Sequence, residues 1–341
     1  MVAADKRPSA FEGHSIQETA KLLGGDAKLV KALRLPSESR HMVLSLMSAQ
    51  SLTRSIAKVF HHPPSMDARA IMVRMRLINE ADVMGKLQHP NIACVKKLYE
   101  KRGLTILEIE HAGDCDITDI LAEQNLMTEQ ASRPIIKQVL SALCYMHDAG
   151  FVHRDVKGDN IIINKSTGKA TLVDFEFACR WGAGRYLQKS VGSMQYASPE
   201  ILTKKQYTGP EVDMWSLGVT LYTMVTGFFP FEGTTSSDYR RSMMRMNIDF
   251  SNLSPSLCDL LHQLLRLDPA TRITASAALE HPWVTDSSTS PSPFSSAAPS
   301  PYSSAAPSPL TSTSVSPSAH LPSPFSRRRN THTETPPVCR A

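Results

Sequence analysis

Short apolar runs and helically spaced apolar positions follow one another along most of the chain, and they predict its elements. The runs at 55–60, 105–110 and 170–173 are typical of strands. Apolar residues three and four positions apart over 71–87 and 129–147 predict two amphipathic helices. In the second helix the apolar stripe predicts a side that faces the core, and it consists of Ile136, Val139, Leu140, Leu143 and Met146.

This pattern stops near Asp286, where the composition changes sharply. From 287 to 341 the chain consists mainly of Ser, Pro, Thr and Ala, with repeated Ser-Pro steps and few large apolar side chains. Such a segment cannot bury enough apolar surface to offset the entropy lost on ordering, so we predict a disordered tail. The tail either has no defined role or is a phosphorylatable segment that binds partners. Its Arg327-Arg328-Arg329 run is a candidate nuclear import signal.

Composition and charge argue against several classes of protein. With 341 residues, 41% of them hydrophobic, the chain is long enough for one two-lobed unit or two domains. The net charge of +5 is modest, which argues against a dedicated nucleic-acid binder. The longest apolar run, 217–231, is broken by glycine and proline, so no membrane span is expected. The six cysteines form no Cys-x-x-Cys pair and predict reduced thiols in a cytoplasmic protein, with a nuclear location as the alternative.

A charged stretch at 153–160, His-Arg-Asp-Val-Lys-Gly-Asp-Asn, carries the strongest chemical signal. Phosphoryl transfer explains the spacing of its Asp155, Lys157 and Asn160. In that chemistry the Asp accepts the proton of the substrate hydroxyl, the Lys neutralises charge on the moving phosphoryl group, and the Asn holds a magnesium ion. Asp155 and Lys157 are therefore the candidate catalytic residues.

Two further motifs lie downstream of this stretch. Asp174-Phe175-Glu176 follows Asn160 after a predicted strand, and Ser198-Pro199-Glu200 comes later. Together the three motifs resemble those of the eukaryotic protein kinase family, over roughly residues 20–286. The segment from Asp174 to Glu200 then corresponds to the activation segment of that family.

The resemblance implies an α+β fold of two lobes with ATP and Mg²⁺ between them. The β-rich N-lobe is expected at about 20–109 and the larger helical C-lobe at about 113–286, after an N-terminal extension at 1–19. Two more motifs are similar to those of the calmodulin-kinase-like branch, namely Asp213-Met214-Trp215-Ser216-Leu217-Gly218 and His281-Pro282-Trp283.

The position of the phosphate-binding lysine depends on the strand register. The stretch 17–35 fits either a capped helix or a first strand. In the family a strand Val precedes the lysine by fifteen residues, and Val43 and Lys58 have that separation. A second register would place the glycine-rich loop at Gly24-Gly25, but it would put Ser45 in the lysine position. We therefore favour Lys58.

The other residues of the nucleotide site follow from the same resemblance. Glu80 is expected to pair with Lys58, although either residue alone is equally typical of a solvated surface. Asn160 and Asp174 are the expected magnesium ligands. The remaining candidates are Glu110 and Ala112, whose backbone would bind adenine, Asp116 near the ribose, and Ile162, which would pack on the adenine opposite Val43.

Four positions depart from the family pattern. Pro36, Glu38 and His41 stand where three phosphate-loop glycines are expected, and Glu176 replaces the glycine of Asp-Phe-Gly. A carboxylate at ~5 Å from a phosphate oxygen would cost about 3 kcal/mol at an effective dielectric constant of about 20. Two hypotheses therefore remain, a Ser/Thr protein kinase with an unusual phosphate loop, or a pseudokinase scaffold that regulates a partner with impaired ATP binding.

The activation segment bears on the substrate and on regulation. Gly192-Ser193 and Lys157 resemble features of Ser/Thr kinases, so a protein Ser or Thr hydroxyl is the expected substrate. The frequent loop phosphosite is Lys189 here, which argues against activation by loop phosphorylation, with Ser190 as a possible substitute. We expect a monomer that acts on a protein substrate or regulates a protein partner, and a buried ion pair between Glu200 and Arg272.

Overall fold

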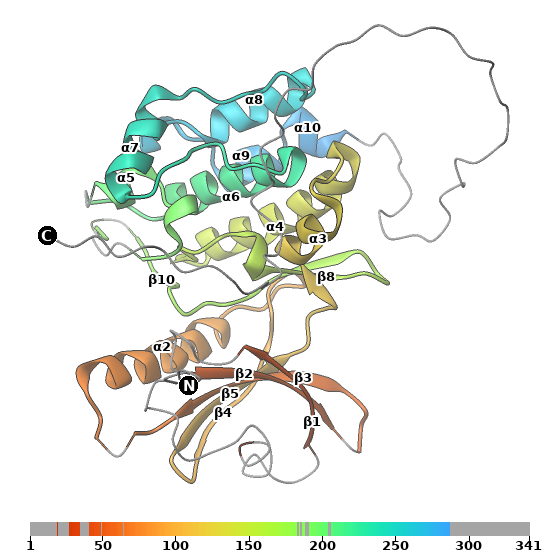
Figure 1. Cartoon of the computed structure of the whole chain (residues 1–341), viewed down its shortest axis with the longest axis vertical. Helices are drawn as coiled ribbons and strands as arrows, with labels where there is room; N and C mark the ends of the chain where they lie inside the picture. Colours follow the sequence, from red (N-terminus) through yellow and green to blue (C-terminus); the bar gives the residue numbers. More distant parts are fainter. Residues whose placement is uncertain are drawn as a thin grey trace, which may run out of the picture.

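The chain folds into a small β-rich lobe and a larger helical lobe (Figure 1). The computed structural model describes residues 19, 27–34, 41–48, 50–63, 65–182, 184, 186–187, 191–203 and 206–286. The predicted two-lobed α+β fold is confirmed. The predicted tail, the glycine pair at 24–25 and the loop at 35–40 lie outside the described residues.

An antiparallel five-stranded sheet forms the small lobe, in the order β1-β2-β3-β5-β4. The stretch 17–35, which fits either a helix or a strand, contains β1 in its described part. The strand predicted at 105–110 is confirmed as β5, and Glu110 is its last residue. The strands are β1 (Ala27–Arg34), β2 (His41–Ser48), β3 (Arg54–His61), β4 (Val95–Lys101) and β5 (Leu104–Glu110).

Helix α2 (Ala68–Met84) packs on this sheet through one face that includes Leu77, Ala81 and Met84. It begins three residues before the apolar stripe predicted from 71, because Asp67 caps it by accepting a hydrogen bond from the Ala70 amide at 2.6 Å. The first turn places only the small Ala70 in the core, while Ile71 is exposed, so apolar spacing did not mark this start.

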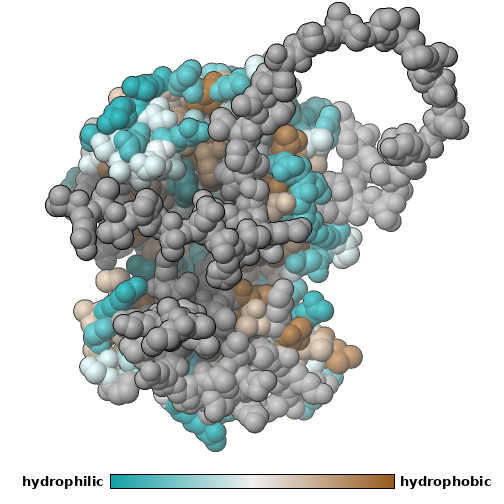
Figure 2. Space-filling view, in the orientation of Figure 1, coloured by the Kyte–Doolittle hydropathy of each residue, from teal (hydrophilic) through white to brown (hydrophobic). Residues whose placement is uncertain are grey.

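The larger lobe is built around α4 (Glu129–Asp148), and its predicted apolar stripe is fully buried. Hydrophilic residues dominate the coloured surface of this lobe in Figure 2. No helix in the described part of the chain is both long and apolar enough to cross a membrane. The other main elements are β6 (Cys115–Asp116), α3 (Ile117–Gln124), β7 (Phe151–Val152), β8 (Ile161–Asn164), β9 (Lys169–Leu172), β10 (Cys179–Arg180), α5 (Pro199–Leu202), α6 (Pro210–Thr226), α7 (Ser236–Arg245), α8 (Pro255–Leu264), α9 (Ala275–Leu279) and α10 (Pro282–Thr285).

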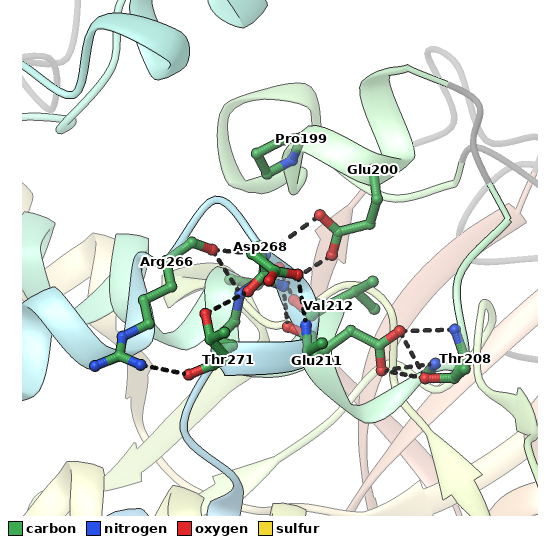
Figure 3. A network of polar contacts seen from close by, with 12 residues as sticks. Pro199, Glu200, Thr208, Glu211, Val212, Arg266, Asp268 and Thr271 are labelled. Carbon is green, nitrogen blue, oxygen red and sulfur yellow. Dashed lines mark hydrogen bonds and ion pairs between the residues drawn. The ribbon is translucent and has the colours of Figure 1, made fainter.

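A buried ion pair fixes the end of the activation segment to the base of this lobe. Arg272 donates to the two carboxylate oxygens of Glu200 at 2.8 and 3.3 Å, as predicted. The same guanidinium donates to the backbone carbonyls of Arg266 and Glu211, and it lies over the ring of Trp215. Figure 3 shows Glu200 pointing from its helix into this network. Every donor direction of the buried cation is therefore directed at an acceptor or a ring.

Candidate active site

Strands β2 and β3 position the predicted phosphate-binding lysine. Val43 and Lys58 are direct partners across the two strands, which supports the chosen register. Side chains alternate along β3, so Ala57 and Val59 enter a small core on one face while Ile56 and Lys58 face the cleft between the lobes. The sheet thus points one cation into the cleft from a rigid strand.

Lys58 joins three elements through its ammonium group. Its Nζ lies 2.7 and 2.9 Å from the two carboxylate oxygens of Glu80 on α2, so the predicted ion pair is present. The same atom lies 2.7 Å from Oδ1 of Asp174, which follows β9. The Phe175 amide donates to Glu80 at 3.1 Å, which ties the start of the activation segment to α2.

Lys58 attracts both carboxylates of this cluster, but burial, with repulsion from Asp174, raises the pKa of Glu80. Burial alone would lower the pKa of Lys58, but the charges of Asp174 and Glu80 raise it above its usual value. Burial would likewise raise the pKa of Asp174, yet attraction to Lys58 holds that pKa well below its usual range. Lys58 is therefore a fixed cation and Asp174 a fixed anion at neutral pH.

The predicted catalytic residues form one hydrogen-bonded group. Lys157 Nζ lies 2.9 Å from Oδ2 of Asp155 and donates to the Ser193 hydroxyl at 2.8 Å. The Ser193 amide donates to Oδ1 of Asp155 at 2.9 Å. Asn160 donates through Nδ2 to the Asp155 carbonyl at 2.8 Å and to its carboxylate at 3.1 Å. Catalytic loop and activation segment thus meet at the Asp155 carboxylate.

Gly192 allows this close approach. Its φ is +87°, and a Cβ atom there would lie 2.5 Å from the Arg154 carbonyl oxygen. Any side chain would therefore have to push the activation segment away from the catalytic loop.

Asp213, in the first turn of α6, holds the backbone of the catalytic loop at 153–160 through its carboxylate. Its carboxylate accepts hydrogen bonds from the amides of His153 and Arg154 at 2.9 and 2.7 Å. It also contacts Nε2 of His147 at 2.9 Å and is fully buried. The sequence marked Asp213 only as part of a helix-start motif, and the structure shows that it orients the loop.

The cleft between the lobes has a volume of about 410 Å³. This lies within the range of small-molecule sites. All the predicted nucleotide-site residues except Glu80 line it. The cleft is also lined by residues that no sequence motif marked, among them Leu33, Ile109, Cys115, Asp119 and Val173.

The charged and polar side chains that line the cleft fit a nucleotide with a bound magnesium ion. Lys58 offers a fixed cation for phosphate oxygens, while Asp174 and the Asn160 side chain offer oxygen atoms for a metal ion. Magnesium commonly takes only one or two protein ligands and completes its shell with water and substrate phosphates. No cluster of three His, Cys, Asp or Glu side chains that could hold a metal ion alone exists among the described residues.

Glu176 is a half-buried carboxyl beside this site. Burial and then the charge of Asp174 raise its pKa to about 7. Arg76 of α2, whose guanidinium lies 4.8 Å from the ring centre of Phe177, partly offsets this shift. Near neutral pH the side chain therefore exists in both protonation states, in contrast to the glycine expected at this position.

Asp116 caps α3 at the rim of the cleft, where its carboxylate accepts the Asp119 amide at 2.7 Å. Burial, with repulsion from Asp119 and Asp159, raises its pKa to about 6. A carboxyl with a raised pKa binds more protons in the folded than in the unfolded state, so its contribution to stability falls as pH rises through that window.

We predict that Asp116→Asn raises the melting temperature at pH 7 but leaves it nearly unchanged at pH 4. Asn removes the charge and still caps a helix well. The gain should grow between about pH 4 and pH 6 and then level off, as measured by thermal unfolding in matched ionic strength. An equal gain at both pH values would show that the charge of Asp116 is not the cause.

Comparisons with known proteins agree with this geometry. A family model for the protein kinase domain matches residues 42–284. The chain is 36% identical over 210 residues to sperm motility kinase Z of Mus musculus, a match that covers 61% of this chain and 42% of the relative. It is 34% identical over 213 residues to NUAK family SNF1-like kinase 2 of Homo sapiens, covering 62% of this chain and 33% of the relative. It is 32% identical over 209 residues to the probable serine/threonine-protein kinase MARK-A of Dictyostelium discoideum, covering 61% of this chain and 20% of the relative.

These matches span less than half the length of each of these curated relatives. The family model, in contrast, covers well over half of this chain and includes the cleft and both lobes. The chain therefore belongs to the protein kinase family.

Proposed function

We propose that this chain is a Ser/Thr protein kinase that transfers the γ-phosphoryl group of ATP to a protein Ser or Thr hydroxyl. The Asp155 carboxylate carries the proposal, because it accepts hydrogen bonds or ion contacts from Lys157, Asn160 and the Ser193 amide at 2.9 to 3.1 Å. Asn160 of this group lines the same cleft as Lys58, which is paired with Glu80. Two names among the relatives, sperm motility kinase and serine/threonine-protein kinase, agree with it.

Each residue has one task in this reaction. Lys58, held by Glu80, would bind phosphate oxygens of ATP, and Asp155 would accept the hydroxyl proton of the substrate. Lys157 lies between Asp155 and Ser193 and would stabilise charge on the transferred group. Asn160 and Asp174 would hold Mg²⁺, which supplies charge neutralisation at the phosphates.

Glu176 favours the pseudokinase as a second candidate function, because a carboxyl beside Asp174 can oppose phosphate binding. One experiment separates the two. The chain is titrated with Mg-ATP while its melting temperature is followed, and phosphate transfer to a generic Ser/Thr peptide is measured beside it. Asp174→Asn serves as the variant that should lose magnesium-dependent binding.

A kinase should show a rise in melting temperature together with transfer. Binding without transfer would leave a nucleotide-binding pseudokinase. A chain that neither binds nor transfers would be a scaffold that keeps only the shape of the site.

We predict that the preferred peptide substrates carry Arg or Lys a few positions before the Ser or Thr. Asp116 and Asp159 both line the cleft, and opposite charge there aids docking. Asp159→Asn should weaken the preference several-fold on a peptide array. Asp82→Asn, which changes a surface carboxylate of α2 paired with Lys86, is the control. An array without any basic preference would contradict the prediction.

A further inference from the structure

Tyr207 lies between α5 and α6 and takes part in three contacts that no motif of the sequence marks. Its ring is 3% exposed and packs with the buried residues Ala197, Ile201 and Val212. Leu187 of the activation segment packs against the same cluster. The ring therefore anchors Tyr207 in the core of the helical lobe.

The backbone of Tyr207 pairs with the activation segment. The Leu187 amide donates to the Tyr207 carbonyl at 2.9 Å, and the Tyr207 amide donates to the Leu187 carbonyl at 3.1 Å. This is a two-bond antiparallel bridge. It fixes the middle of the activation segment to the stretch that precedes α6.

The hydroxyl of Tyr207 reaches the catalytic loop instead. Arg154 donates through Nη1 to this hydroxyl at 3.2 Å and through Nε to the Phe177 carbonyl at 2.8 Å. Asn79 of α2 donates to the neighbouring Ala178 carbonyl at 2.9 Å. The first residues of the activation segment are thus held from the catalytic loop and from α2.

Arg154 is adjacent to the catalytic Asp155, so its orientation bears on the reaction. In kinases that are switched by phosphorylation, new contacts between arginine and a phosphate order the activation loop. Here Tyr207 and Phe177 offer neutral oxygens to the same guanidinium. Hydrogen bonds from a charged donor are among the stronger ones in proteins.

We propose that Tyr207 is a positioning residue, whose hydroxyl holds Arg154 against the Phe177 carbonyl and so keeps the activation segment in its substrate-accepting arrangement without a phosphate on the loop. This rests on the proposed kinase activity, because it concerns how that same site is assembled. Tyr207 does not line the cleft, and its hydroxyl acts through Arg154.

The test is Tyr207→Phe, which removes one oxygen atom and keeps the packed ring. The kcat for peptide phosphorylation should fall about tenfold, as for one lost hydrogen bond to a charged group, while the KM for ATP stays within about twofold. Amide hydrogen exchange of residues 191–198 should become faster, while that of α4 stays as in the native chain. Phosphatase treatment of the native chain should change neither quantity.

Tyr222→Phe is the matched control. It also removes one hydroxyl from a buried ring, but this hydroxyl donates to the Asp249 carbonyl at 3.0 Å and not to a residue of the catalytic loop. It should leave kcat and the exchange of 191–198 unchanged. In an Arg154→Gln background, Tyr207→Phe should have little further effect, because the donor for its hydroxyl is already gone.

Hydrogen exchange needs no catalysis, so it tests this inference even if the native chain transfers no phosphate. In that case the proposed activity fails, while faster exchange in Tyr207→Phe alone still supports the positioning role. Native-like exchange and kcat in a folded Tyr207→Phe chain would overturn it. Phosphatase treatment of the native chain would overturn it as well if it made the amide exchange of residues 191–198 faster or abolished phosphate transfer.

Discussion

Asp155→Asn should lower kcat for phosphate transfer by about 10²- to 10⁴-fold, the usual contribution of a positioned general base. The amide oxygen of Asn can still accept a hydrogen bond from the Ser193 amide, so the local geometry should persist. What is lost is the basic oxygen that takes the substrate proton and the charge that Lys157 contacts at 2.9 Å.

The measurement is kcat with a peptide substrate beside the Mg-ATP thermal shift. The thermal shift should remain, because Lys58 and Asp174 are unchanged. Asp249→Asn, which alters an exposed carboxylate that accepts the Ser251 amide, is the control and should keep native activity. A variant at Asp155 with activity within tenfold of the native chain would remove Asp155 from the role of base.

Glu200→Ala should lower the free energy of unfolding by about 3–5 kcal/mol, as for a buried pair that loses one partner. The side chain of Arg272 is 0% exposed, so its charge would remain buried without a counter-charge. Backbone carbonyls would still accept hydrogen bonds from the guanidinium, but they cannot neutralise its charge. Urea unfolding of the native chain and the variant gives the difference.

A surface ion pair provides the comparison. Asp82→Ala breaks an exposed pair between Asp82 of α2 and Lys86, which follows the helix, and should cost no more than about 1 kcal/mol. Glu200→Met combined with Arg272→Met should recover much of the loss, because it removes both buried charges. A loss below about 1 kcal/mol for Glu200→Ala would mean that water reaches Arg272 in the variant.

Motif spacing, read with the family resemblance, was enough to predict the residues that carry the chemistry. Val43 and Lys58 were aligned by the separation that the resemblance implies, and the structure pairs them across β2 and β3. Glu80 was placed by the same resemblance and lies on α2. Asp155, Lys157 and Asn160 share one short loop, so their proximity is already present in the sequence. Such short-range geometry needs no knowledge of the rest of the fold.

Contacts between distant segments could not be predicted in the same way. Tyr207 meets Arg154 across 53 positions, and Asn79 meets Ala178 across 99. No periodicity connects such pairs, because only the completed fold brings them together. The same holds for Cys115, which enters the cleft because β6 pairs with β8.

Of the three residues that replace the expected glycines of the phosphate loop, the structure describes only one. Pro36 and Glu38 lie outside the described residues, whereas His41 begins β2 and lines the cleft. Thus a bulky side chain occupies the cleft wall at the position where the family resemblance implies a glycine.

The contacts of Lys58 with Glu80 and Asp174 can form only one after the other while the chain is being translated. Glu80 follows Lys58 by 22 positions, but Asp174 follows it by 116. At 5–20 residues per second, a ribosome needs about 6 to 23 s to add that interval. Once Glu80 has been added, the nascent small lobe holds a lysine and a glutamate whose remaining partners, Asp174 and the Phe175 amide, have not yet been synthesised. The small lobe can therefore reach its final electrostatic arrangement only after translation has passed the middle of the chain.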